Sequence, residues 1–130
     1  DRVELVRTVA AWTGEGPCAA ISGVRPAGAR HHAEEALWAA LWDQGATLPV
    51  EEARLSTTYD GDGRMRRAGL ELWPREDGTD AWARRGAGEV LCGSSLDLGA
   101  LQLDCAFFRW HLEGREGIGH YDVLRRAPAA

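Results

Sequence analysis

The sequence contains no lysine, and all 15 of its basic residues are arginine. These arginines are dispersed along the chain, and the 20 acidic residues give a net charge of -5 and a pI near 5.3. A protein that follows a nucleic-acid backbone needs clustered positive charge, because it must neutralise phosphates along its binding surface. The composition therefore predicts no nucleic-acid partner.

Cysteine is scarce, and long apolar runs are missing. The three cysteines, Cys18, Cys92 and Cys105, are odd in number and widely spaced, so they cannot form a complete disulfide framework. We expect buried free thiols in a reducing, cytoplasmic compartment. No segment approaches the roughly 20 apolar residues that a helix needs to cross a bilayer, so we predict no membrane span.

Short β-prone runs separated by turn residues fill most of the chain. With 130 residues, the chain is long enough for one core and too short for two, so residues 1–130 are expected to form a single domain. Seven or eight short strands in succession predict an antiparallel meander that curls into a barrel. The runs are Val3–Thr13, Cys18–Val24, Glu51–Tyr59, Arg64–Trp73, Asp80–Arg85, Glu89–Leu98, Leu101–Leu112 and Ile118–Leu124.

One segment, at about residues 30–44, has the spacing of a helix instead. Ala33, Leu37, Ala40 and Leu41 recur at helical intervals, and the segment is rich in alanine. Gly45 is a suitable stop. We therefore predict one helix inserted between the strands.

The start of this segment carries metal-ligating side chains. His31, His32, Glu34 and Glu35 would lie within one helical turn, but no third ligand from a strand is specified. Carboxylates are also favourable at the positive end of a helix dipole. We expect a solvated helix start here, with no metal site and no cofactor.

The clearest signal is a β-hairpin near the end of the chain. Leu101–Leu112 and Ile118–Leu124 flank a short connection that contains Gly114, the pattern typical of a tight antiparallel turn. With Gly114 and Arg115 at the tip, Trp110 pairs with Gly119, Phe108 with Tyr121 and Asp104 with Arg125. A tryptophan ring over a glycine fills the gap that the missing side chain leaves in a sheet.

The two faces of this hairpin differ in chemistry, and only one of them can face the barrel interior. The polar face carries Arg109, His111, His120 and Asp122. If this face is inside, His111, His120 and Asp122 are candidates for proton transfer, because a histidine tuned by a carboxylate exchanges protons near neutral pH. Arg109 would then orient a ligand.

The aromatic face carries Phe108, Trp110 and Tyr121. If this face is inside, the polar face is solvated and holds cross-strand ion pairs, while Trp110 and Tyr121 line a binding pocket. The six tryptophans of the chain favour a wide apolar lining for an unsaturated ligand. Ordinary core packing accounts equally well for each tryptophan taken singly.

The closing segment, residues 107–126, contains Glu113-Gly114-Arg115, then Gly117-Ile118-Gly119, then Asp122 followed by Arg125 or Arg126. In these features it resembles the C-terminal lipocalin-like domain of the carotenoid hydratase (hydroxyneurosporene synthase) and AttH-like superfamily. The resemblance implies a lipocalin-like barrel, a terpenoid or polyketide-like substrate, and cofactor-free cyclisation, isomerisation or hydration. It also implies that the chain is a second barrel, or a single-barrel relative, so a partner would be an upstream barrel domain or a second copy of the chain.

Two function classes follow from the sequence. In the first, the barrel holds a hydrophobic, unsaturated small molecule and acts on it by acid–base chemistry. In the second, it is a non-catalytic ligand-binding or structural barrel that docks on a partner domain. A cone-shaped α+β isomerase would explain the helix better, but it requires more helix than the sequence indicates.

Overall fold

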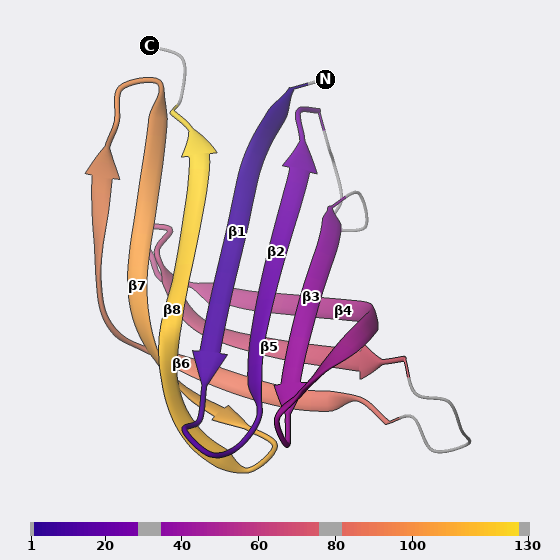
Figure 1. The fold of residues 1–130 in the computed structure, drawn as a ribbon. Helices are drawn as coiled ribbons and strands as arrows, with labels where there is room; N and C mark the ends of the chain where they lie inside the picture. Colours follow the sequence, from indigo (N-terminus) through magenta and orange to yellow (C-terminus); the bar gives the residue numbers. More distant parts are fainter. Residues whose placement is uncertain (1, 29–34, 76–81, 128–130) are drawn as a thin grey trace.

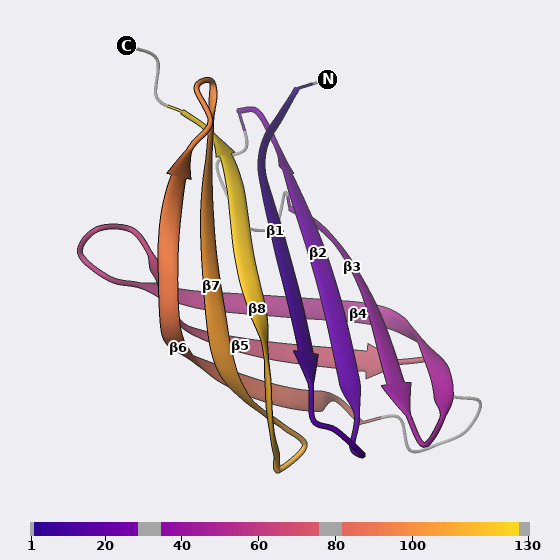
Figure 2. The same ribbon diagram turned by 60° about the vertical axis from the view of Figure 1, so that its left-hand side comes forward.

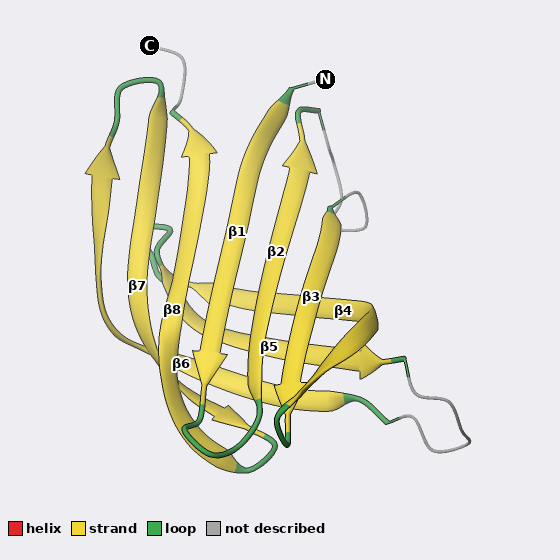
Figure 3. Cartoon of the chain, in the orientation of Figure 1, coloured by secondary structure: helices red, strands yellow, loops and turns green. Residues whose placement is uncertain are grey.

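The computed structural model describes residues 2–28, 35–75 and 82–127, and the chain is all-β within these ranges (Figure 3). Eight strands follow one another, several of them long enough to bend. They are β1 (Val3–Trp12), β2 (Cys18–Pro26), β3 (Ala36–Asp43), β4 (Ala46–Tyr59), β5 (Met65–Pro74), β6 (Arg84–Asp97), β7 (Leu101–Leu112) and β8 (Arg115–Arg126).

Each strand pairs antiparallel with the next, and β8 pairs with β1, which closes the sheet into a barrel. In Figures 1 and 2, β1, β2 and β3 run alongside β7 and β8, whereas β4 and β5 cross behind them. Within the described ranges, every strand pairs on both sides over part of its length, although β4 beyond Pro49 has no partner on the β3 side. The predicted antiparallel barrel is confirmed.

The predicted helix at residues 30–44 is wrong over its described part, because Ala36–Asp43 form strand β3, which pairs with β2 from Ala36 to Trp42. Residues 29–34 lie outside the described ranges. Leu37 and Leu41 face inward, and Trp38 and Trp42 are exposed. Because both faces are apolar, the period of two is hidden, and the spacing of four between the leucines fits a helix as well as a strand.

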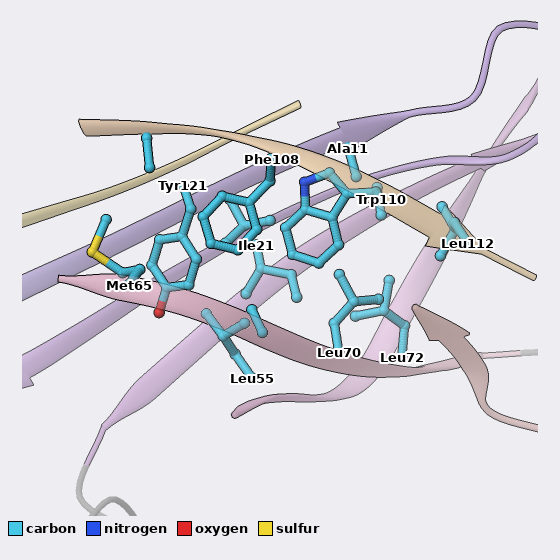
Figure 4. Close-up of a cluster of buried hydrophobic side chains, with 14 of the residues drawn as sticks. Ala11, Ile21, Leu55, Met65, Leu70, Leu72, Phe108, Trp110, Leu112 and Tyr121 are labelled. Atoms are coloured by element: carbon cyan, nitrogen blue, oxygen red, sulfur yellow. The ribbon is translucent and has the colours of Figure 1, made fainter. Parts of the chain in front are cut away.

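The aromatic face of the β7–β8 hairpin forms the barrel core. Phe108, Trp110 and Tyr121 are each fully buried. The ring centroids of Phe108 and Trp110 lie 5.4 Å apart, and those of Phe108 and Tyr121 lie 5.6 Å apart. Figure 4 shows these rings packed over Leu70 and other leucines of the opposite wall. Burying three large aromatic side chains on one hairpin sets which face of every neighbouring strand is inside.

The hairpin register differs from the predicted one by two residues. Leu112 pairs with Arg115, so the tip is Glu113 and Gly114, and both have positive φ angles of 51° and 78°. Such a two-residue turn matches the twist of the strands. A shift of two residues preserves the inward and outward faces, since side chains alternate with a period of two.

The shifted register changes the partners of the aromatic residues. Trp110 lies between Gly88 on β6 and Gly117 on β8, and a Cβ atom on Gly88 would come within 2.6 Å of the indole. Trp110 thus fills the space over Gly88, and not over the predicted Gly119. Gly119 instead pairs with Phe108.

The expected pairing of Asp104 with Arg125 occurs diagonally. The Arg125 guanidinium forms an ion pair with the buried Asp104 carboxylate, which also accepts hydrogen bonds from Ser95 and Gln102. Burial opposes the charged form, but these hydrogen bonds and the Arg125 charge outweigh it, so the pKa of Asp104 lies below its ordinary value. Asp104 therefore ties β6, β7 and β8 together.

Barrel closure depends on two glycines of β8. A side chain at Gly117 would collide with the backbone of Trp12 and Thr13, and one at Gly119 with the backbone of Ala10 and Ala11. These backbone atoms belong to β1 and to Thr13, the residue that follows it. Because Gly117 and Gly119 have no Cβ atom, β8 can approach β1 closely.

Gly119→Ala should destabilise the protein by about 3 kcal/mol, because the added methyl group must displace strand backbone, which cannot rotate away as a side chain can. Urea unfolding followed by circular dichroism measures this change. Gly61→Ala is the matched control, since a Cβ atom there meets no neighbour, and it should stay within about 0.5 kcal/mol. Equal stability of the two variants would contradict this account of barrel closure.

Candidate functional site

A single charged side chain interrupts the inward face of β1. Leu5, Arg7, Val9 and Ala11 alternate with outward-facing residues, and Arg7 is only 4% exposed. A buried charge requires a partner, because removing it from water without one costs several kcal/mol. Arg7 therefore marks a buried polar site within the apolar interior of the barrel.

The partner of Arg7 is Glu35, immediately before β3. Arg7 Nε donates to Glu35 Oε2 at 2.8 Å, and Nη2 donates to Oε1, so the pair is bidentate. Gly23 of β2 lies beside the carboxylate, and a Cβ atom there would come within 2.9 Å of Glu35 Oε2. The missing side chain of Gly23 thus leaves the space that Glu35 occupies.

The remaining donors of Arg7 are also used. Nη1 donates to Thr57 Oγ1 at 3.2 Å and to Tyr121 Oη at 3.1 Å, and Nη2 donates to the Leu55 carbonyl at 3.2 Å. The Leu55 carbonyl lies in the part of β4 beyond Ala46–Pro49, the segment that pairs with β3. Arg7 thus gives the Leu55 carbonyl the hydrogen bond that a backbone N–H of a neighbouring strand gives to such carbonyls elsewhere in the sheet. We call Arg7, Glu35, Thr57 and Tyr121 the Arg7 cluster.

The hydroxyl groups of Thr57 and Tyr121 lie 2.6 Å apart. Burial raises the pKa of Tyr121 above its ordinary value, although the positive charge of Arg7 opposes this. Burial disfavours the charged form of Arg7, but the hydrogen bonds and charge of Glu35 outweigh it, and the pKa of Arg7 is raised. At neutral pH the cluster thus holds a guanidinium and a neutral phenol.

The Arg7 cluster lies at the wall of a cavity of about 700 Å³. Cavities that bind drug-sized ligands span roughly 300–1,000 Å³. The cavity shares Leu55 and Leu70 with the barrel core, and it is open to solvent along the exposed residues of β4. Its lining residues are Arg7, Glu35, Leu37, Arg54, Leu55, Ser56, Thr57, Tyr59, Gly69, Leu70, Glu71, Arg85 and Gly86.

The polar face of the closing hairpin lies outside the barrel. His111 and Arg109 are exposed, and Arg109 Nε lies 3.3 Å from Glu116 Oε1. His120 Nδ1 lies 3.0 Å from Asp122 Oδ2, although the two are not aligned for a hydrogen bond, and each side chain is about one-third exposed. The structure brings His120 and Asp122 together, but away from the cavity, and Arg109 pairs in register with Ile118.

The predicted aromatic ligand contacts lie in the core behind the cavity. Phe108, Trp110 and Tyr121 are not lining residues, although the Tyr121 hydroxyl reaches the Arg7 cluster. None of the six tryptophans lines the cavity. Trp12, Trp38, Trp42 and Trp82 are exposed on the outer surface.

Sequence reasoning missed Arg7, Glu35 and Thr57. One signal pointed to Arg7, since an arginine on an apolar strand face is rarely fully buried unless it has a charged partner. Glu35 was assigned to a helix start, and nothing in its neighbourhood indicates a partner 28 residues earlier in the chain. Thr57 resembles any threonine in a β-strand.

Within the described ranges, no group of three or more His, Cys, Asp and Glu side chains is arranged to hold a metal ion. No helix in these ranges is long and apolar enough to cross a membrane. A scan against protein-family models finds no match, and a search of curated proteins finds no similar sequence. The candidate site therefore rests on the geometry of this chain.

Glu35→Ala should destabilise the protein by about 3–5 kcal/mol, because it leaves the buried Arg7 charge without its carboxylate. In the double variant Arg7→Met/Glu35→Leu, most of this loss should be recovered, since no buried charge remains. Glu71→Ala is the control, because it breaks an exposed ion pair with Arg85 and should cost less than about 1 kcal/mol. Urea unfolding that gives Glu35→Ala and Glu71→Ala the same loss would contradict the structural role of the pair.

Proposed function

We propose that this barrel binds a small, largely apolar molecule in the cavity beside the Arg7 cluster. The observation that carries the proposal is a solvent-accessible cavity of about 700 Å³ whose wall contains a buried ion pair and the Thr57 hydroxyl. A buried ion pair adds little to the stability of a fold, because apolar residues of similar size are often at least as stabilising. Its presence at the cavity wall therefore favours a role in binding.

The cavity lining supports this class of ligand. Leu37, Leu55 and Leu70 supply apolar surface, and the hydroxyl of Thr57 supplies a polar group that can fix orientation. Ligand sites in general combine an apolar lining with a few placed polar groups. The charged side chains of Arg54 and Arg85 are exposed and that of Glu71 is partly exposed, so all three remain solvated.

Cofactor-free cyclisation, isomerisation or hydration of an unsaturated ligand, and a relation to the carotenoid hydratase and AttH-like superfamily, remain proposals. The eight-stranded barrel is compatible with both. Proton transfer by His111, His120 and Asp122 would take place on the outer face, since these residues lie outside the cavity. Turnover that survives replacement of both histidines by alanine would assign the chemistry to other groups.

An apolar probe, 2-ethylnaphthalene, stands for the proposed ligand. Leu37→Trp should lower the affinity for this probe at least tenfold, because the larger side chain occupies the cavity. Titration calorimetry measures the affinity, and native mass spectrometry of the purified protein reveals a co-purifying apolar compound. Thr58→Trp is the matched control, since it adds the same indole at an exposed position outside the lining, and it should bind as the wild type does. Absence of binding by the wild type, with no co-purifying compound, would overturn the proposal.

A second function, docking on a partner, is favoured by the outer face of the other half of the barrel. Ile118, Trp12, Cys18 and Trp42 form one row across β8, β1, β2 and β3, and Ala10, Ala20 and Ala40 form the next. Phe107 and Trp38 continue the surface on β7 and β3. Five large side chains of this association face are 42–63% exposed: Trp12, Trp38, Trp42, Phe107 and Ile118.

We propose a second copy of the chain as the partner, because the association face is largely apolar and few charged side chains interrupt it. His120 Nδ1 lies 3.0 Å from Asp122 Oδ2, and Arg109 at the edge of the face pairs with Glu116. A symmetric dimer of two such faces buries apolar surface of both partners. By contrast, β4, β5 and β6 expose charged side chains, namely Arg54, Arg66, Arg67, Arg85 and Glu89.

The exposed rings supply part of the area that such a dimer needs. At about 150–250 Å² for a whole aromatic side chain, four rings that are each about half exposed offer roughly 300–500 Å². A stable interface needs about 800 Å² from each partner, and the alanines and Ile118 add to the contribution of the rings.

The wild type should be dimeric in sedimentation equilibrium, and Trp12→Glu/Trp42→Glu should be monomeric with an unchanged circular dichroism spectrum. Trp82→Glu is the control, because Trp82 is at least as exposed as Trp12 and Trp42 but lies outside the association face, next to Arg84. A wild type that stays monomeric over a wide concentration range would overturn this second proposal.

A further inference from the structure

We propose that the cavity selects a neutral ligand that carries a hydrogen-bond-accepting oxygen, such as a ketone carbonyl, and that the Thr57 hydroxyl donates to that oxygen. This inference rests on the proposed ligand-binding function and specifies its ligand class. It follows from counting the hydrogens and lone pairs in the Arg7 cluster.

The two hydroxyl groups share their hydrogen bonds unequally. Thr57 Oγ1 and Tyr121 Oη each accept a hydrogen bond from Arg7 Nη1, and one of them donates to the other across 2.6 Å. Only one of the two hydroxyl hydrogens is used in that contact, because each hydroxyl has a single hydrogen and two lone pairs. One O–H group of the pair is therefore left to donate elsewhere.

The free O–H group belongs to Thr57. Tyr121 is fully buried and is not a lining residue, so its hydrogen would have no acceptor if it did not donate to Thr57. Thr57 is half-buried and lines the cavity. No described residue other than Arg7 and Tyr121 forms a hydrogen bond with its hydroxyl.

The cluster strengthens this donor. Both lone pairs of Thr57 Oγ1 accept hydrogen bonds, one of them from a guanidinium, which withdraws electron density from the O–H bond. Hydrogen bonds in such a chain polarise one another in a site of low dielectric constant. The Thr57 hydroxyl is thus a better donor than an isolated threonine at the surface.

The same cluster disfavours an anionic ligand. All Arg7 donors are taken by Glu35, Thr57, Tyr121 and the Leu55 carbonyl. A carboxylate at Thr57 would find no free guanidinium hydrogen, and it would lie near the negative charge of Glu35. A neutral acceptor meets neither obstacle.

The test compares three probes of nearly equal shape on the whole protein by titration calorimetry. These are 2-acetylnaphthalene, 2-ethylnaphthalene and 2-naphthoate, which differ in a carbonyl, a methylene and a carboxylate. The wild type should bind the ketone about 3–10-fold more tightly than the hydrocarbon, the range expected for one hydrogen bond, and should bind the carboxylate most weakly.

Two variants assign the donor. Arg7→Met/Glu35→Leu/Thr57→Val/Tyr121→Phe removes both hydroxyls together with the guanidinium that donates to them, so no free donor of the Arg7 cluster remains, and it should bind the ketone and the hydrocarbon equally. Tyr121→Phe alone keeps the Thr57 hydroxyl and should keep the preference for the ketone. An unchanged affinity for 2-ethylnaphthalene shows that each variant retains the folded cavity.

The outcomes separate the two proposals. If the wild type binds neither neutral probe, the proposed ligand-binding function fails, and this inference fails with it. If the wild type binds both neutral probes equally well, or binds the carboxylate best, only the inference about the ligand class is overturned. If Tyr121→Phe loses the ketone preference, the assignment of the donor to Thr57 is wrong.

Discussion

The buried ion pair of Arg7 and Glu35 is the interaction on which the site depends. It joins β1 to the residue before β3, and through Thr57, Tyr121 and the Leu55 carbonyl it reaches β4 and β8. These contacts occur where β4 continues beyond its pairing with β3. Arg7 thus satisfies the buried Leu55 carbonyl at this opening, and the same guanidinium orients the Thr57 hydroxyl at the cavity wall. Structure and proposed binding share one charge network.

Glycines and large aromatic side chains of the barrel provide the space for this arrangement. Phe108, Trp110 and Tyr121 fill the interior, Gly88 leaves room for the indole of Trp110, and Gly117 and Gly119 allow β8 to approach β1. Gly23 leaves room for the Glu35 carboxylate. Large rings and bare backbone therefore divide the barrel into a packed core and a cavity that opens to solvent.

Much of the fold could be predicted because strand patterns and turn residues are local. The closing hairpin, its aromatic face and the contact between Asp104 and Arg125 were all found, although the register was displaced by two residues. The helix prediction for Ala36–Asp43 was wrong because leucines face inward while tryptophans are exposed on the outside. The strand therefore shows no alternation of apolar and polar residues. The outward tryptophans belong to the association face, whose apolar character appears only when β1, β2, β3, β7 and β8 lie side by side.

By itself, the sequence determined the all-β class, the antiparallel order of most strands and the two chemically distinct faces of the hairpin, since each depends on neighbours within a few residues. Only the tertiary structure decided which face is inside, because that choice requires the opposite wall of the barrel. It also decided the site, because the residues that bond to Arg7 are distant from it in the sequence. Glu35, Thr57 and Tyr121 lie 28, 50 and 114 residues after Arg7. Contacts over such distances follow from barrel closure and from the need to pair a buried charge, and no local pattern encodes them.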